Sequence, residues 1–287
     1  MMRLALSGAA AVLLMESLLV AQTPTPVSVV FRAVVGDAPF ACGQTYSGLG
    51  RTKSTVSVTD FRIFVSRLSL VTADGTAVPV ALTQDGVWQH DDVALLDFED
   101  GTGSCANGTP EVHTTLDGAV PPGAYVGVRF DVGLPFDVNH RDPTLQPSPL
   151  NLSRLFWNWS AGYKFARIDL KTTGQPQGWV LHLGSTGCEP FDGPTSVPST
   201  CAHENRPRIL LAPFDAARHA VRFDLAALLA DADLDGNTPD TASGCMSGPT
   251  DPECGALFAA LGLPFADRPA SAQAVFSAVA KAKPAAH

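Results

Sequence analysis

The clearest pattern in this 287-residue chain is an alternation of apolar and polar positions, in short runs separated by turn residues. Residues 26–35, "PVSVVFRAVV", predict a β-strand of this kind, and residues 54–75 predict a longer one. In the longer run the apolar positions up to Val65 lie on one face, and from Leu68 onward they lie on the other. A switch of face within one strand predicts a β-bulge or bend near Ser66.

Similar runs continue to about residue 224, with an "ADGT" hairpin turn and a Pro-Pro-Gly turn between further strands. Beyond them, Asp224 predicts the N-cap of a short helix in "LAALLA", and residues 251–262 and 269–282 predict two more helices. The pattern therefore predicts a mainly β protein, a two-sheet β-sandwich or barrel-like domain with a short helical C-terminal segment at about 225–283.

Composition agrees with a single β domain, here placed at residues 23–287, because 25 Gly and 23 Pro are spread along the chain. The first 22 residues are typical of a secretory signal peptide, with Arg3, an apolar stretch interrupted by Glu16, and a cleavage site near Ala21 to Thr23. A membrane anchor is the alternative for this segment. No later stretch is long enough to span a bilayer, so we expect a periplasmic or secreted protein.

The net charge of −9 argues against nucleic acid or an anionic membrane surface as a partner, since both require clustered Lys and Arg. Enzyme motifs are missing from the sequence: there is no G-x-S-x-G, no H-E-x-x-H, no P-loop and no G-x-G-x-x-G after a strand. We therefore expect no enzyme, although a hydrolase whose triad meets only in the fold stays open.

Six cysteines follow the signal segment, and an even number in an exported chain predicts disulfides. Ring size favours two short links, Cys188–Cys201 and Cys245–Cys254, which leaves Cys42–Cys105 as a long-range link. A cysteine-based zinc site is the alternative, but the chain has no C-x-x-C pair.

Candidate chemistry centres on "SRLFWNWSAGYKFARIDLK", residues 153–171. If 155–161 is a strand, Trp157 and Trp159 point to the same face, and an aromatic half-core is the simplest interpretation. His140, in the Pro-rich loop 135–153, precedes this segment and His182 follows it. No histidines stand in local metal-binding spacing, and hydrogen-bonded structural imidazoles are the alternative for both.

Four segments together carry a resemblance to a known family: "LPFDVNHRDP", "FWNWSAGYKFARIDL", "HLGSTGC" and "GCMSGPTDPEC". They resemble the MbnP-like family, also called the metallo-mystery pair four-Cys motif proteins, over most of the mature chain, from about residue 28 to 263. Members of this family are exported bacterial proteins, paired with a diheme cytochrome c peroxidase/MauG-like protein.

The resemblance implies a copper-binding protein in which the first Trp of W-x-W, here Trp157, is oxidised to kynurenine by the diheme partner. Kynurenine offers an aromatic amine and a ketone, whereas an indole N–H only donates. His140 and His182 are the expected further ligands of one copper ion per chain, because both lie in the matching segments. Met246 is a weaker candidate that would favour Cu(I). Trp159 would relay electrons or shield the site.

His90 and His113 are weaker candidate ligands. A different class of function also stays open from the sequence, a disulfide-stapled β-sandwich adhesion or glycan-binding module without a metal. In that protein the two Trp rings would either belong to the hydrophobic core or form a platform on which a sugar stacks.

Overall fold

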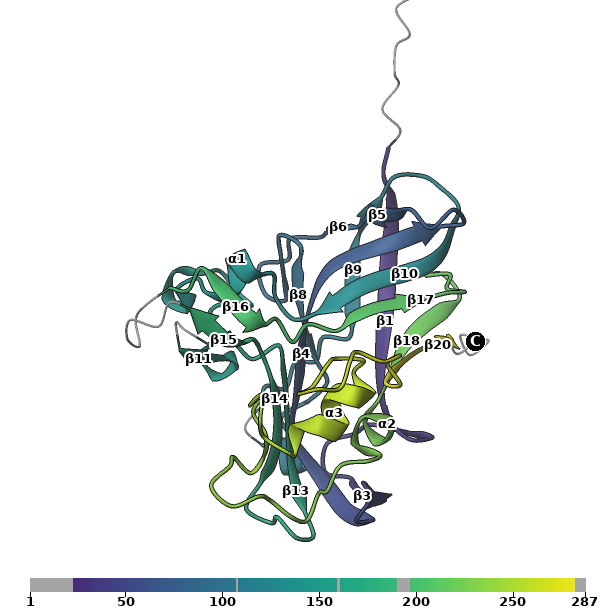
Figure 1. The fold of residues 1–287 in the computed structure, drawn as a ribbon. Coiled ribbons are helices and arrows are strands. Elements are labelled where there is room, and N and C mark those ends of the chain that lie inside the picture. The colour runs from purple at the N-terminus through teal and green to yellow at the C-terminus, as the bar shows by residue number, and fades with distance from the viewer. Residues whose placement is uncertain (1–22, 107, 159–160, 190–196, 282–287) are drawn as a thin grey trace, which may run out of the picture.

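The computed structural model describes residues 23–106, 108–158, 161–189 and 197–281 (Figure 1). Two large sheets lie within these residues. The smaller of the two has the strand order β20–β18–β1–β9–β6, and β2 also pairs with β1. Its strands are β1 (Thr25–Val35), β2 (Ala38–Pro39), β6 (Ala81–Leu82), β9 (Thr115–Val120), β18 (His219–Asp224) and β20 (Phe276–Ala280). The predicted strand at 26–35 is therefore β1, antiparallel to β9 and parallel to β18.

The larger sheet has the order β17–β10–β4–β13–β14–β19, and β3, β5 and β8 also pair with β4. It contains β3 (Thr45–Leu49), β4 (Ser54–Thr72), β5 (Ala77–Pro79), β7 (Gln89–His90), β8 (Val93–Asp97), β10 (Tyr125–Val132), β13 (Ala166–Thr172), β14 (Trp179–Leu183), β17 (Arg208–Leu211) and β19 (Gly244–Cys245). β4, the predicted long strand, is 19 residues long and can therefore hold several partners along its length.

The predicted bend in β4 is confirmed. Its register with β10 shifts between Ser66 and Ser69, and Arg67 there has a φ of 56°. A residue in the left-handed region at such a shift marks a β-bulge, which turns the following apolar residues to the other face. The predicted hairpin turn is also present, because Val71 pairs with Ala77 across it.

The two large sheets pack face to face through aromatic side chains. Phe31 of β1 meets Phe130 of β10 with ring centroids 5.3 Å apart, and Phe61 of β4 meets Phe223 of β18 at 5.1 Å. Both pairs are edge-to-face, an arrangement that aromatic rings in a core prefer. The mainly β prediction is confirmed in its sandwich form, since the described strands do not close into a barrel.

Helix is scarce in the described residues: α1 (Phe136–Asn139), α2 (Leu225–Leu229) and α3 (Cys254–Ala260), with 3₁₀ turns η1 (Gly103–Cys105), η2 (Pro143–Leu145) and η3 (Ser153–Leu155). α2 begins as predicted, because Asp224 accepts hydrogen bonds from the N–H groups of Ala226 and Ala227. α3 confirms the helix predicted at 251–262.

The helix predicted at 269–282 is wrong in its described part, and residues 282 and 283, where the predicted helical segment ends, lie outside the described residues. Residues 276–280 form β20, which pairs antiparallel with β18. The alanines there favour helix as isolated residues, but Phe276 packs against Phe130 and Phe223 in the core. Tertiary packing therefore overrides local propensity.

Three disulfides join Cys42 with Cys105, Cys188 with Cys201, and Cys245 with Cys254. This is the pairing that ring size favours. The Cys188–Cys201 link crosses a small hairpin of β15 (Thr186–Glu189) and β16 (Thr200–His203). Figure 1 shows this hairpin grouped with α1 and β11 at one end of the molecule.

None of the helices in the described ranges has the length and apolarity needed to cross a bilayer. The predicted signal peptide, residues 1–22, lies outside the described residues.

Candidate metal centre

Trp157 lies on a much shorter strand than the sequence predicts. β11 (Phe156–Asn158) forms a hairpin with β12 (Gly162–Tyr163), and Phe156 pairs with Tyr163. Trp159 lies outside the described residues, so its predicted place on the same face as Trp157 stays a prediction. Trp157 itself is half-buried, so it is not part of the sandwich core.

Three neighbours define the place of the Trp157 ring. A Cβ on Gly184 would come within 2.5 Å of Cζ3 and 3.0 Å of Cη2, so the benzo edge of the indole lies directly over this glycine. The imidazole of His182 lies with its centroid 6.4 Å from the Trp157 ring, and the Nζ of Lys164 lies 6.0 Å from that ring. Burial, followed by nearby Arg167, lowers the pKa of Lys164.

His182 is a buried residue of β14, and its two ring nitrogens have different surroundings. Its Nε2 lies 2.7 Å from Oδ1 of Asp169 on the neighbouring strand β13. Its Nδ1 is buried and finds no hydrogen-bond partner in the part of the chain that the structure describes. A buried imidazole nitrogen without a partner is costly, which makes it a candidate metal ligand. The residues here therefore fit a metal ion.

Asp169 stays ionised although it is largely buried. Burial would raise the pKa of its carboxyl, but hydrogen bonds from His182 and Arg167 outweigh that effect and place the pKa below its usual range. The site thus contains a fixed negative charge next to the imidazole.

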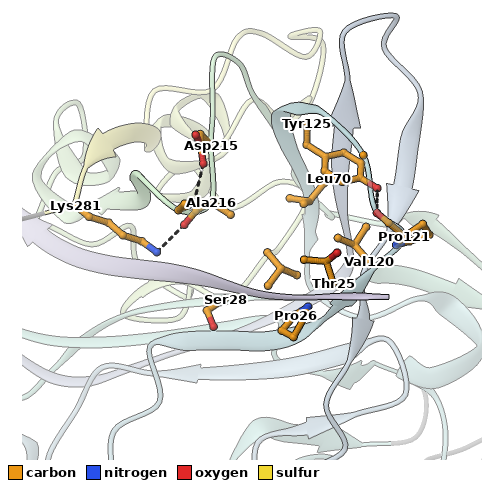
Figure 2. Close-up of a pocket in the computed structure, with 13 residues that line it drawn as sticks. Thr25, Pro26, Ser28, Leu70, Val120, Pro121, Tyr125, Asp215, Ala216 and Lys281 are labelled. Atoms are coloured by element: carbon orange, nitrogen blue, oxygen red, sulfur yellow. Dashed lines mark hydrogen bonds between the residues drawn. The ribbon is translucent and has the colours of Figure 1, made fainter. Parts of the chain in front are cut away.

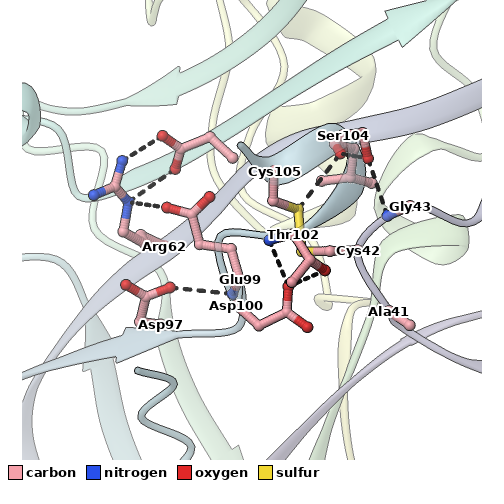
Figure 3. Close-up of a disulfide and its surroundings, with 12 residues drawn as sticks. Ala41, Cys42, Gly43, Arg62, Asp97, Glu99, Asp100, Thr102, Ser104 and Cys105 are labelled. Atoms are coloured by element: carbon pink, nitrogen blue, oxygen red, sulfur yellow. Dashed lines mark hydrogen bonds and ion pairs between the residues drawn. A yellow bond between two sulfur atoms is a disulfide. The ribbon is translucent and has the colours of Figure 1, made fainter. Parts of the chain in front are cut away.

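A row of buried and partly buried polar side chains, most of them charged, crosses three strands and ends at His182; it is here called the charge row. It consists of Glu99, Arg62, Asp60, Arg167, Asp169 and His182. Strand register aligns it, because Arg167 lies opposite both Arg62 and His182. Figure 3 shows its far end, where Arg62 meets Glu99 near the Cys42–Cys105 disulfide.

Two carboxyls at the far end of the charge row have raised pKa values, Glu99 in the row and Asp97 next to it. Burial is the main cause for both, and it raises the pKa of Asp97 and of Glu99 to about 7. Asp60 adds to the effect on Glu99, whereas the guanidinium of Arg62 opposes it. The row is therefore ionised near His182 and partly protonated at its other end near neutral pH.

His140 comes from a different element of the fold than His182. It follows α1 and is buried, with its Nε2 3.2 Å from Nδ2 of Asn139 and 3.4 Å from Sγ of Cys201. A ring nitrogen of His140 and the sulfur atoms of Cys188 and Cys201 all lie within 4.8 Å of one another. The two sulfurs are joined in a disulfide, however, so they are not thiolates that could bind a metal. Asn139, the neighbour of His140, accepts from the N–H of Tyr163, which pairs with Phe156 in the hairpin that contains Trp157.

Among the described residues, no hydrogen bond, ion pair or ring contact joins Met246, His90 or His113 to Trp157 or His182. Met246 follows Cys245, whose strand β19 runs beside β14, but its side chain is 42% exposed. His113 stacks on Trp88 with its Nδ1 2.6 Å from the carbonyl oxygen of Leu95. His90 lies 3.5 Å from Asp91.

A cavity of about 510 Å³ at the start of β1 contains none of the predicted ligands (Figure 2). Two of its polar side chains already have partners, since Lys281 donates to the carbonyl oxygen of Ala216 and Tyr125 donates to that of Pro121. We therefore place the candidate site at Trp157 and His182.

Comparisons with known proteins agree with the resemblance of the sequence segments. The model of the MbnP family matches residues 24–247. Among solved structures, MbnP from Methylosinus trichosporium matches with a TM-score of 0.80 and 35% sequence identity, over 91% of this chain and 100% of that chain. No curated protein matches the chain. The family model and the solved structure together show that this chain belongs to the MbnP family.

Proposed function

We propose that this protein is an exported copper-binding protein, matured when a diheme cytochrome c peroxidase/MauG-like enzyme oxidises Trp157 to kynurenine. It would be a substrate of that enzyme and not a catalyst, and it would act in copper homeostasis outside the cytoplasm. The observation that carries the proposal is the buried Nδ1 of His182, which lacks a described partner and lies in a ring beside Trp157.

The oxidation would turn a side chain that cannot bind a metal into one that can. Cleavage of the indole C2–C3 bond adds two oxygen atoms from water and removes four electrons, which the oxidised haem enzyme accepts. Hydrolysis then releases the C2 carbon as formate. The aromatic amine and the ketone that remain can coordinate copper, whereas the indole N–H can only donate.

Gly184 supports this change because of the part of the ring that it contacts. It lies under Cζ3 and Cη2, which belong to the benzo ring. That ring survives when the pyrrole ring opens, so the contact can hold residue 157 in place in both forms. The buried imidazole of His182 supplies the second ligand atom for one Cu(I) ion.

His140 and Met246 are the further ligands that we propose from the family resemblance. His140 would contribute its imidazole from the residue that ends α1, and Met246 its thioether from the residue after β19. Copper prefers imidazole, and Cu(I) also accepts a thioether, so both residue types suit it.

Purification of the full chain after co-expression with a diheme partner tests the proposal. We expect about one copper per chain and the mass shift of kynurenine in the peptide that contains Trp157. Trp157→Phe should abolish copper binding, while Trp179→Phe, a change to a tryptophan of the core, should leave it intact. Full copper loading with an intact indole at position 157 would refute maturation, and binding to a glycan array without copper would favour the adhesion alternative.

A further inference from the structure

We infer that Asp169 is a positioning residue, which keeps His182 in the tautomer whose Nδ1 has a lone pair that could bind a metal. Arg167 in turn fixes the carboxylate of Asp169. This inference rests on the proposed function for the identity of the metal, but its first consequence concerns the protein without metal.

The hydrogen bond between the two side chains decides the tautomer. An ionised carboxylate only accepts, so the Nε2 that lies 2.7 Å from Asp169 Oδ1 must contribute its N–H. In a neutral imidazole the other nitrogen then has a lone pair. That nitrogen is Nδ1, the buried atom that has no partner among the described residues.

Arg167 prevents Asp169 from turning its other oxygen toward the imidazole. Its Nε and Nη2 donate to Oδ2 of Asp169 at 2.9 and 2.6 Å, so the two carboxylate oxygens serve different partners. Arg167 is held in turn by Asp60, 3.1 Å from its Nε. The charge row thus fixes the rotamer of Asp169 from behind.

The backbone fixes the imidazole from the other side. His182 pairs with Arg167 across the β13–β14 ladder, and its carbonyl oxygen accepts from the hydroxyl of Ser247 at 3.0 Å. The same hydroxyl accepts from the N–H of Gly184 at 3.0 Å. Ser247 therefore links His182 to Gly184, the glycine that the Trp157 ring packs over. Carboxylates that orient metal-bound histidines in this way are a general feature of metal sites.

Asp169→Asn provides a sharp test, because the amide has one donor and one acceptor. The guanidinium of Arg167 only donates, so the carbonyl oxygen of Asn must face it and the NH₂ must face His182. Nε2 then becomes the acceptor, and the proton moves to Nδ1. An equivalent exchange at a catalytic Asp–His pair is known to leave geometry intact and trap the wrong tautomer.

The first measurement is ¹⁵N NMR of histidine-labelled protein without copper, with the His182 signals assigned by their loss in His182→Gln. We expect the Nε2–H tautomer in the unchanged protein and the Nδ1–H tautomer in Asp169→Asn. Asp131→Asn is the matched control, because Asp131 is also buried and paired with an arginine, Arg206, at 2.8 Å. This control should leave the His182 tautomer unchanged.

The second measurement uses the matured protein and Cu(I). The Nδ1 signal should shift on copper binding while Nε2 keeps its proton, and Asp169→Asn should lower copper affinity about ten- to a hundredfold. An Nδ1–H tautomer in the unchanged protein, or weaker binding in Asp169→Asn with an unchanged tautomer, would overturn the inference. If the tautomers behave as expected but matured protein binds no copper, the proposed function fails and the positioning role of Asp169 stands.

Discussion

Trp157 and Trp179 are both packed over a glycine, but they belong to regions of opposite character. Trp179 begins β14, is completely buried, and has Cδ2 3.0 Å from where a Cβ on Gly244 would be. Trp157 is half-buried on a three-residue strand, over Gly184 just beyond the end of β14. One strand thus connects a tryptophan of the core with the tryptophan of the candidate site.

The difference shows how the two regions are stabilised. Trp179 belongs to the hydrophobic core, and its Nε1 finds no hydrogen-bond partner among the described residues. Trp157 instead lies among polar groups, the imidazole of His182 and the ammonium of Lys164. Close packing in the core therefore fixes the Trp179 ring. The Trp157 ring is held by a few specific contacts and remains partly exposed to solvent.

The largest expected effect separates the two tryptophans by stability. Trp179→Ala should lower the free energy of unfolding by about 3–5 kcal/mol, because it empties a closed volume in the core. Trp157→Ala should cost under about 2 kcal/mol, because a half-buried ring loses less apolar contact. Denaturant titration of both variants measures the two values. Equal losses would mean that Trp157 is a core residue after all.

Gly184→Ala sharpens the comparison on the side of the site. A methyl group there would lie 2.5 Å from Trp157 Cζ3 and 2.8 Å from the carbonyl oxygen of Tyr163, so the indole must move, at a cost of about 1–3 kcal/mol. Near-UV circular dichroism should detect the displaced ring. Gly123→Ala is the control, since its nearest neighbour is the Tyr125 ring at 3.2 Å. An unchanged Trp157 signal would contradict the packing described here.

The smallest expected effect concerns the polar region at the far end of the charge row. The pKa of Glu99 is raised to about 7 in the folded protein, so the folded state binds its proton more tightly than the unfolded state. The contribution of Glu99 to the free energy of unfolding is therefore fully present at acidic pH. It is lost as the pH rises from the pKa of the unfolded state through about 7.

Glu99→Gln, which mimics the protonated form, should match the unchanged protein below about pH 4, where the carboxyl is protonated in both the folded and the unfolded state. Above pH 7 it should be more stable by on the order of 1–2 kcal/mol. Unfolding titrations at several pH values test this, with the difference between the two proteins as the readout. A constant difference at all pH values would show that Glu99 does not titrate in this range.

Local sequence patterns predict a large part of this fold because local physics decides those elements. The bulge at Arg67 follows from a switch of apolar face, and the cap of α2 follows from one aspartate. The helix predicted at 269–282 fails because the strand there depends on β18, which lies more than fifty residues away in the chain.

The candidate site was harder to predict than the fold. Asp60 and Arg62 alternate with apolar residues in β4, as Arg167 and Asp169 do in β13. That pattern is typical of a strand with one solvated face, yet the structure largely buries these charges. Only their cross-strand register, which the sequence does not state, joins them to His182. A clue was available in "ARIDLK", where two opposite charges stand two positions apart.

The parallel pairing of β1 with β18 has a consequence for how the chain is made. Phe31 pairs with Val221, so a ribosome delivers β1 some 190 residues before the strand that completes its sheet. Pairing over such a distance is slow, and pulsed hydrogen exchange during refolding should find the β1–β18 amides among the last to be protected. Until then β1 has an open edge that can pair with another chain. The risk of aggregation in this protein is therefore highest while the chain is only partly folded, and it falls when β18 pairs with β1.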